Sequence, residues 1–201
     1  MGLNGPMRQG RPTLSTRDRP AYRQHMIALT PPPTDTATRI RRIRRSDAHA
    51  LERFYADLSG ESRRTRFFSV GGRPSHERSE SFCTPDHDHA EGFVAVLPTT
   101  NGAGERIVGH LCLEPAGGHT AEVAVAVADD LQHRGIGRRL LDAGVRWALA
   151  EGFTTLTASA WIGNAPIHHL LAGLGRPTHA SDAGSGIEDI RIDLRAPGVA
   201  A

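Results

Sequence analysis

Apolar and polar positions divide the chain into a polar beginning and a patterned remainder. Residues 1–37 are rich in proline and arginine and show no periodic apolar pattern, whereas short apolar runs alternate with polar turns from Thr38 onward. A segment with few apolar side chains to bury cannot offset the entropy of folding. The sequence therefore predicts a disordered tail at 1–37, a folded domain at 38–195 and a disordered C-terminus at 196–201.

The apolar spacing within the predicted domain changes between that of strands and that of helices. Short runs of β-branched residues favour strands, and apolar positions three or four apart favour helices. The predicted strands are 39–44, 92–97, 107–114, 120–128, 153–160 and 187–194. The predicted helices lie around 51–58, over a short turn at 59–68, directly after Gly137 and over 164–174, and the polar, histidine-rich residues 71–90 predict a linker. Helices before and after a mixed sheet indicate an α/β or α+β fold.

Composition and charge exclude several classes of protein. The chain has 24 arginines, no lysine and 22 acidic residues, and a net charge of +2 gives no reason to expect a nucleic-acid partner. The arginines of 39–45 alternate with isoleucines, which predicts a solvated strand face. No apolar stretch has the length of a membrane span. Two cysteines without CxxC spacing, Cys83 and Cys112, favour a reducing, cytoplasmic setting.

Residues 121–152 predict a strand, a glycine-rich turn and a helix in direct succession. The strand is made of small and β-branched residues, and the turn contains Gly135 and Gly137. The first turn of a helix leaves backbone N–H groups without intrahelical partners, and glycine lets a ligand approach the backbone closely. This combination predicts a phosphate-binding turn.

The hexapeptide QHRGIG, Gln132–Gly137, resembles the acetyl-CoA motif (Q/R)xxGx(G/A) of the GNAT N-acetyltransferase superfamily, and the order of elements from Thr38 to Leu194 fits that resemblance. The resemblance implies a mixed, mostly antiparallel sheet with a splayed strand pair. It also implies that pantetheine lies between strand 123–127 and strand 156–160. The residues expected to bind acetyl-CoA are Val125, Ala126, Val127, Gln132, His133, Arg134, Gly135, Ile136, Gly137, Arg138 and Asn164.

A second segment, SGESRRTRFFS at 59–69, resembles the SxESxxxRFF segment of bacterial protein lysine acetyltransferases of the Pat branch. Residues 86–89 and the pair Ala121-Glu122 are also similar to that branch. The resemblance implies that Glu122 is the general base. A lysine amine has a pKa near about 10.4 and must lose a proton before it attacks a thioester, so a carboxylate suits this role.

Other chemistry-bearing residues give weaker signals. Many GNAT enzymes carry a tyrosine on the helix after the asparagine, where it acts as general acid. Here that position is Leu170 or Leu171, and no tyrosine follows Tyr55, so the general acid stays unassigned. His168 and His169 lie nearby in the sequence. Cys112 lies within an apolar strand, which favours a core role over an acetyl-cysteine intermediate. The residues His76, Cys83 and 86–89 lack the spacing of a zinc motif, so we expect no metal. They are expected in a mobile loop beside the substrate cleft.

The sequence favours transfer of acetyl from acetyl-CoA to a protein lysine, with an acyl-CoA synthetase as one acceptor to consider. A small amine as acceptor and a non-catalytic acyl-CoA sensor stay open as alternatives. We expect no nucleic-acid or membrane partner and a monomer or homodimer. The sequence does not fix the acceptor, the preferred acyl group or the mode of regulation.

Overall fold

The computed structural model describes residues 38–68, 74–99 and 104–196, all of which lie in the unit that spans 31–201. The predicted tail at 1–37 and residues 197–201 of the predicted C-terminus lie outside the described residues. So does Asn101-Gly102, where an Asn-Gly pair between two predicted strands indicates a hairpin turn. Within the described ranges, no helix combines the length and apolar character needed to cross a membrane.

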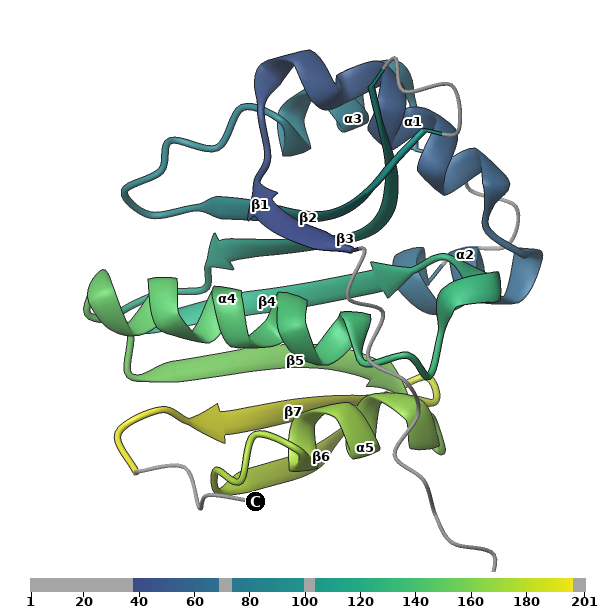
Figure 1. The fold of residues 1–201 in the computed structure, drawn as a ribbon. Helices are drawn as coiled ribbons and strands as arrows, with labels where there is room; N and C mark the ends of the chain where they lie inside the picture. The colour runs from purple at the N-terminus through teal and green to yellow at the C-terminus, as the bar shows by residue number, and fades with distance from the viewer. Residues whose placement is uncertain (1–37, 69–73, 100–103, 197–201) are drawn as a thin grey trace, which may run out of the picture. The chain divides into compact units, whose positions relative to one another are not determined.

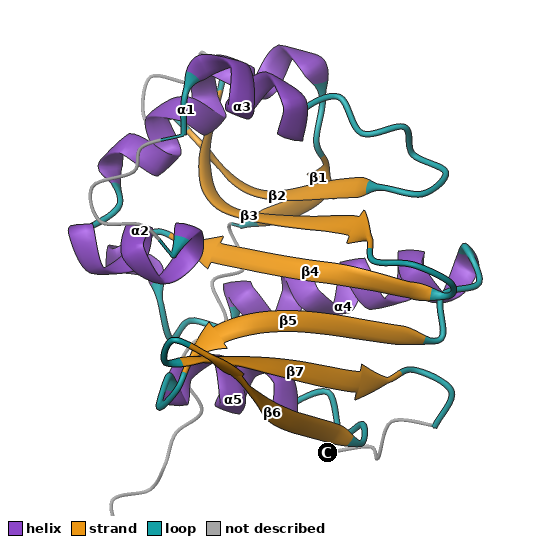
Figure 2. Cartoon of the chain, turned by 180° about the vertical axis from the view of Figure 1, so that it is seen from behind, coloured by secondary structure: helices purple, strands orange, loops and turns teal. Residues whose placement is uncertain are grey.

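A seven-stranded sheet forms the centre of the described unit (Figures 1 and 2). Its strand order is β1-β2-β3-β4-β5-β7-β6, and every neighbouring pair is antiparallel except the parallel pair β4–β5. The strands are β1 Arg39–Arg42, β2 Glu91–Pro98, β3 Glu105–Pro115, β4 Thr120–Val127, β5 Thr155–Trp161, β6 Thr178–Gly184 and β7 Ile187–Asp193. The predicted mixed, mostly antiparallel α/β class is confirmed.

The described ranges contain five α-helices, four of which cover the two faces of this sheet. They are α1 Ala48–Asp57, α2 Gly60–Phe67, α3 His76–Phe82, α4 Ile136–Ala150 and α5 Ala165–Ala172, with 3-10 turns η1 Arg45–Asp47 and η2 Asp129–Leu131. Helices α4 and α5 share one face, and the apolar residues of α4 that recur at helical spacing pack there against β2, β3 and β4. Helices α1 and α3 pack on the opposite face around the fully buried Leu51 and Tyr55.

Two elements differ from the sequence prediction. The predicted linker at 71–90 contains α3, whose N-cap Ser75 accepts a hydrogen bond from the backbone N–H of Arg78 and which buries Ser79 and Phe82. With only one large apolar side chain in seven residues, α3 has no visible helical pattern. Strand β6 was also not predicted, because all seven of its residues are exposed at the sheet edge. Its place is fixed by backbone pairing to β7.

The predicted solvated face of 39–45 is wrong at Arg41. Its guanidinium donates two hydrogen bonds to the carboxylate of Asp47, at 2.7 and 2.8 Å, and a third to Glu105 at 3.0 Å. The side chains of Arg41 and Asp47 are each only 10% exposed. Arg41 therefore connects the edge strand β1 to the start of α1, a tertiary contact that strand alternation alone does not reveal.

Candidate active site

The two parallel strands β4 and β5 separate after three residue pairs. Their register runs from Thr120 opposite Thr155 to Glu122 opposite Thr157. Beyond that point β4 continues to pair with β3 and β5 continues to pair with β7. A V-shaped gap therefore opens toward the C-terminal ends of both strands, which diverge in Figure 2. Glu122 belongs to the last residue pair before this divergence, so it lies at the vertex of the gap.

The backbone of β4 alternates between its two neighbours. The backbone N–H of Ala128 donates to Val108 on β3, and the carbonyl of Ala126 also points toward β3, where it lies 3.3 Å from the position of a Cβ on Gly109. Backbone groups two residues apart point the same way in a strand. The backbone groups of Val125 and Val127 therefore face the gap, whereas those of Ala126 face β3.

The glycine turn lies at the open end of this gap and leads into α4. Gly135 is the N-cap with φ +79°, and His133 also has a positive φ of +59°. The first bond of the helix runs from the N–H of Arg139 to the carbonyl of Gly135 at 3.1 Å. The N–H groups of Ile136, Gly137 and Arg138 precede that bond, so they have no helical acceptor and are available to an anion.

The side chains of the turn divide into anchors and exposed groups. Ile136 is 1% exposed and fixes the turn to the core, while His133 and Arg134 are exposed. Arg138 donates from Nε to Asp142 at 2.8 Å and from Nη1 to the carbonyl of Gly173. Arg134 is therefore more accessible to a phosphate than Arg138, which already connects α4 to the end of α5.

A network of polar contacts, which we call the α2 latch, joins the start of α2 to the segment before the glycine turn. One carboxylate, that of Asp129, accepts hydrogen bonds from the N–H and Oγ of Ser59, both at 2.8 Å, and from Oγ of Ser62 at 2.6 Å. Gln132 donates from Nε2 to the carbonyl of Val127 at 3.2 Å and to Ser62 at 3.4 Å. The two segments that suggested the family resemblance are therefore in direct contact, about 70 residues apart in sequence.

Helix α2 also reaches the end of β5. The guanidinium of Arg64 lies 5.2 Å from the ring of Trp161, whose Nε1 donates to the carbonyl of Arg64 at 3.4 Å. The ring of Phe68 lies 5.8 Å from the same tryptophan. Because α2 contacts Asp129 after β4 and Trp161 at the end of β5, it spans the mouth of the gap.

Glu122 lies on β4 with an exposed side chain. Its neighbours Ala121 and Val123 pack toward the α4 face, so Glu122 projects from the other face, together with Ala124 and Ala126. Its antiparallel partner on β3 is a second carboxylate, Glu114. Two carboxylates thus stand side by side at the vertex of the gap.

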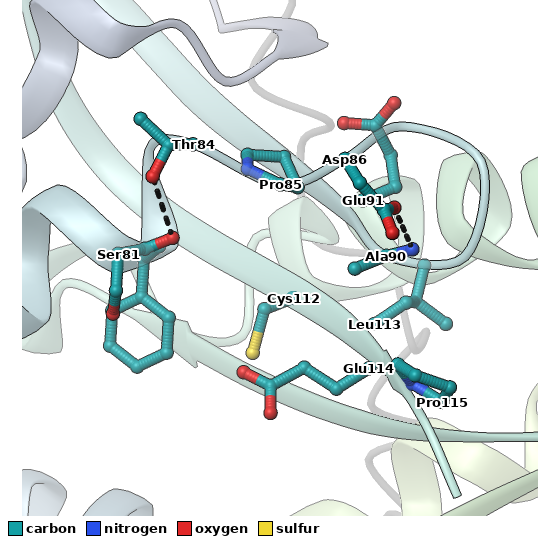
Figure 3. A pocket seen from close by; sticks show the side chains of 11 residues that line it. Ser81, Thr84, Pro85, Asp86, Ala90, Glu91, Cys112, Leu113, Glu114 and Pro115 are labelled. Atoms are coloured by element: carbon teal, nitrogen blue, oxygen red, sulfur yellow. Dashed lines mark hydrogen bonds between the residues drawn. The ribbon is translucent and has the colours of Figure 1, made fainter. Parts of the chain in front are cut away.

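A cavity of about 390 Å³ is lined by Glu114 of this pair and by Asp86 of the loop predicted to flank the substrate. Its walls come from the end of α3, the following loop, the start of β2 and the end of β3. Figure 3 shows Glu114 and Cys112 directed into the same space, with Asp86 and Glu91 on the far wall. The cavity is therefore rich in acidic groups.

Cys112 occupies the core position that the sequence predicts. It is 8% exposed, and Nη2 of Arg66 lies 3.2 Å from its Sγ. Burial raises the pKa of the Cys112 thiol, and the Arg66 cation only partly offsets this effect. A thiol with a raised pKa is a poor nucleophile, which disfavours an acetyl-cysteine intermediate.

The single tyrosine among the described residues lies in the core. Tyr55 is fully buried, its hydroxyl lies 2.7 Å from Nδ1 of His110, and burial raises its pKa. Burial and the nearby Arg66 lower the pKa of His110 to about 3. Both side chains are therefore neutral near pH 7 and shielded from the gap, so neither replaces the tyrosine missing from α5.

Asn164 is the N-cap of α5, where its Oδ1 accepts a hydrogen bond from the N–H of Ile167 at 3.4 Å. Leu171 is buried in the core, and Leu170 packs beside Gly137 of the turn. Nε2 of His168 lies 2.7 Å from Glu188 on β7. Helix α5 thus borders the glycine turn through Leu170 and is fixed to β7 through His168.

The potential metal ligands named from the sequence, which are His76, Cys83 and residues 86–89, do not form one cluster in the structure. Cys83 is buried, Asp86 accepts backbone hydrogen bonds from residues 88, 89 and 90, and His87 pairs with Glu91. His76 belongs to a different set of side chains, together with His49 and Glu52. Residues 86–89 follow α3 as a loop, as predicted.

Comparisons with known proteins agree with this geometry. The chain matches the model of the Acetyltransferase (GNAT) family over residues 51–175, which is more than half of its length. A comparison with curated protein sequences found no match.

Solved structures give a consistent result. The GNAT domain of S. lividans PAT superposes with a TM-score of 0.68 at 25% identity, covering 78% of this chain and 90% of that one. The Salmonella typhimurium protein yncA, determined with its cofactor acetyl-CoA, gives 0.62 at 18% identity over 82% and 99%. Ribosomal-protein-S5-alanine acetyltransferase from Vibrio fischeri gives 0.59 at 18% identity over 78% and 91%. This chain belongs to the GNAT family of acetyltransferases, whose fold uses acetyl-CoA.

Proposed function

We propose that this acetyltransferase modifies the side-chain amine of lysine in a protein. The observation that carries the proposal is the position of Glu122 at the vertex of the gap, with the anion-binding turn at the open end and an acidic cavity alongside. This arrangement offers a place for the donor, for a base and for a cationic acceptor.

The donor would lie along the gap. The N–H groups of Ile136, Gly137 and Arg138 would bind the pyrophosphate, with Arg134 contributing an exposed positive charge. The backbone groups of Val125 and Val127 would hydrogen-bond pantetheine in place of the missing strand pairing. Asn164 would bind the pantetheine arm with its amide N–H₂, because its Oδ1 already accepts from Ile167.

Glu122 would act as general base on the acceptor amine, directly or through one water. Removing a proton from the ammonium group frees the nitrogen lone pair, which attacks the thioester carbonyl; the C–N bond forms and the C–S bond breaks. The CoA thiolate leaves without an assigned acid, since a thiol has a much lower pKa than an amine. The buried position of Cys112 supports direct transfer within a ternary complex.

The acidic cavity supports a cationic acceptor. Asp86, Glu91 and Glu114 contribute negative charge to its wall, and Arg42, 3.1 Å from Glu91, partly neutralises it. A lysine approaching as an ammonium ion would be attracted to this wall before it is deprotonated. The likeness to the PAT domain favours a protein acceptor such as an AMP-forming acyl-CoA synthetase.

Two free cysteines agree with a cytoplasmic setting.

The test compares Glu122→Gln with Glu114→Gln. The two substitutions remove the same charge from paired positions on neighbouring strands. CoA release is measured with an AMP-forming acyl-CoA synthetase and with a panel of small amines. We expect turnover with the protein acceptor, a loss of at least 100-fold in kcat in Glu122→Gln, unchanged acetyl-CoA affinity, and a smaller effect in Glu114→Gln.

Other outcomes assign the function differently. Turnover only with a small amine would make the chain a small-molecule acetyltransferase. Acetyl-CoA binding without turnover on any acceptor would favour a sensor. A larger loss in Glu114→Gln than in Glu122→Gln would move the role of base to β3. Because the chain contains no lysine, acetyl-lysine detected after the reaction comes from the acceptor.

A further inference from the structure

Three potential metal ligands from two helices meet on the surface away from the gap. His49 and Glu52 lie one turn apart on α1, and His76 is the first residue of α3. One ligand atom of each side chain lies within 4.8 Å of the other two. These residues are separated by up to 27 positions in sequence, which is why their spacing matches no metal-binding motif.

The distances between these atoms suit a small cation. Nδ1 of His76 lies 2.9 Å from Oε2 of Glu52, and Nδ1 of His49 lies 3.9 Å from the same oxygen. Zn²⁺ binds nitrogen and oxygen ligands at about 2.0–2.2 Å, so neighbouring ligands in a tetrahedral site are about 3.4 Å apart. The two observed distances bracket that value.

The surrounding groups also favour a cation. The rings of His49 and His76 are stacked, with centroids 4.6 Å apart, so both imidazoles are already beside the carboxylate. The other nitrogen of His76, Nε2, lies 3.6 Å from Oε1 of Glu80. A carboxylate behind a ligating histidine orients the ring and increases its basicity in many metal sites. His49 is mostly exposed, so it can move by the few tenths of an ångström that binding requires.

We propose that His49, Glu52 and His76 form a Zn²⁺ site, with water in the remaining coordination position. Two imidazoles and one carboxylate are a donor set typical of zinc. The ion would join α1 to α3 directly. Because Ser81 and Phe82 at the end of α3 line the acidic cavity, zinc would also stabilise one wall of that cavity.

The test uses the full chain without a histidine tag, stripped of metal by a chelator and titrated with ZnCl₂ against a chromophoric competitor. We expect one equivalent to bind, with affinity at least tenfold weaker in His76→Ala and in His49→Ala. His89→Ala is the matched control, because His89 is also exposed and paired with a carboxylate but lies outside the cluster. Its zinc affinity should be unchanged.

A second readout separates zinc binding from effects on folding. X-ray absorption at the zinc edge should show two imidazoles, and zinc should raise the midpoint of thermal unfolding of the parent chain but not of His76→Ala. Absence of stoichiometric binding, or equal affinity in the parent chain and both histidine variants, would overturn the proposal.

Discussion

The α2 latch depends on one carboxylate, so Asp129→Ala should disconnect α2 from the glycine turn. The substitution removes the acceptor of three hydrogen bonds, from the N–H and Oγ of Ser59 and from Oγ of Ser62. Burial acts to raise the pKa of Asp129, but these hydrogen bonds outweigh it and the pKa lies below its usual value. The folded protein therefore favours the charged form of this side chain.

The solvent exposure of Asp129 limits how much stability the substitution removes. A hydrogen bond to a charged group contributes about 1.5–3 kcal/mol when buried, but Asp129 is exposed and water competes for its oxygens. For three such bonds we expect Asp129→Ala to lower the free energy of unfolding by about 1–2 kcal/mol. Since Ser62 also contacts Gln132 at the start of the turn, we expect acetyl-CoA affinity to fall by roughly threefold to tenfold, equivalent to about 0.7–1.4 kcal/mol.

Urea unfolding and calorimetric titration with acetyl-CoA measure the two quantities. Asp130→Ala is the matched control, because Asp130 is the next residue and is also exposed, with a distant ion pair to Arg106 at 3.9 Å. A double-mutant cycle between Asp129→Ala and Ser62→Ala should give a coupling energy of at least about 0.5 kcal/mol.

Equal losses of stability in Asp129→Ala and Asp130→Ala would refute the reasoning. So would a stable Asp129→Ala variant with unchanged acetyl-CoA affinity, since α2 would then have no influence on the turn. Because the folded protein favours the ionised form of Asp129, the α2 latch stabilises the fold fully at pH values above the ordinary pKa of 3.8. This contribution to the free energy of unfolding is lost as the pH falls below that value.

Two further predictions concern the turn and the core. In Gly137→Ala, the added Cβ lies 3.5 Å from Leu170, which is ordinary contact, so the free energy of unfolding should change by less than about 1 kcal/mol. The acetyl-CoA motif accepts glycine or alanine at this position, so acetyl-CoA affinity measured by calorimetry should change by less than about threefold; strong destabilisation or a loss of affinity of more than about tenfold would contradict this. The lowered pKa of His110 keeps its imidazole neutral in the folded protein, whereas in the unfolded chain it takes up a proton below about pH 6.5. As the pH falls below that value, the free energy of unfolding should therefore decrease by up to about 1.4 kcal/mol per pH unit. Urea unfolding at pH 7 and 5 should show a shallower decline in His110→Asn; an identical decline would mean that this histidine is protonated in the fold.

The central part of the site was predictable because it is local in sequence. Strand, glycine turn and helix follow one another within residues 121–152, and the phosphate-binding N–H groups need only backbone conformations that glycine permits. Most predicted strands and helices are present within a few residues of their expected bounds. The role of Arg138 in acetyl-CoA binding stays a prediction; its contact with the carbonyl of Gly173 depends on the position of α5, which the hexapeptide does not describe.

The remaining features depend on contacts between distant residues. Strand β6 has no buried side chain, so its sequence carries no apolar alternation. Helix α3 buries a single large apolar side chain, Phe82. The latch joins Ser59 and Ser62 to Asp129, and nothing in either segment alone indicates its partner. Tertiary pairing of polar side chains is therefore what sequence patterns failed to predict.

The short paired segment between β4 and β5 also affects how the protein unfolds. Strands β1 to β4 form one continuous hydrogen-bonded ladder, β5 to β7 form another, and only three residue pairs join the two. Amide protons near this junction should exchange with solvent more readily than those inside either ladder, as a boundary between two cooperative folding units. Acetyl-CoA bound along the gap would contact both ladders at once, so its binding would also stabilise the sheet at this junction.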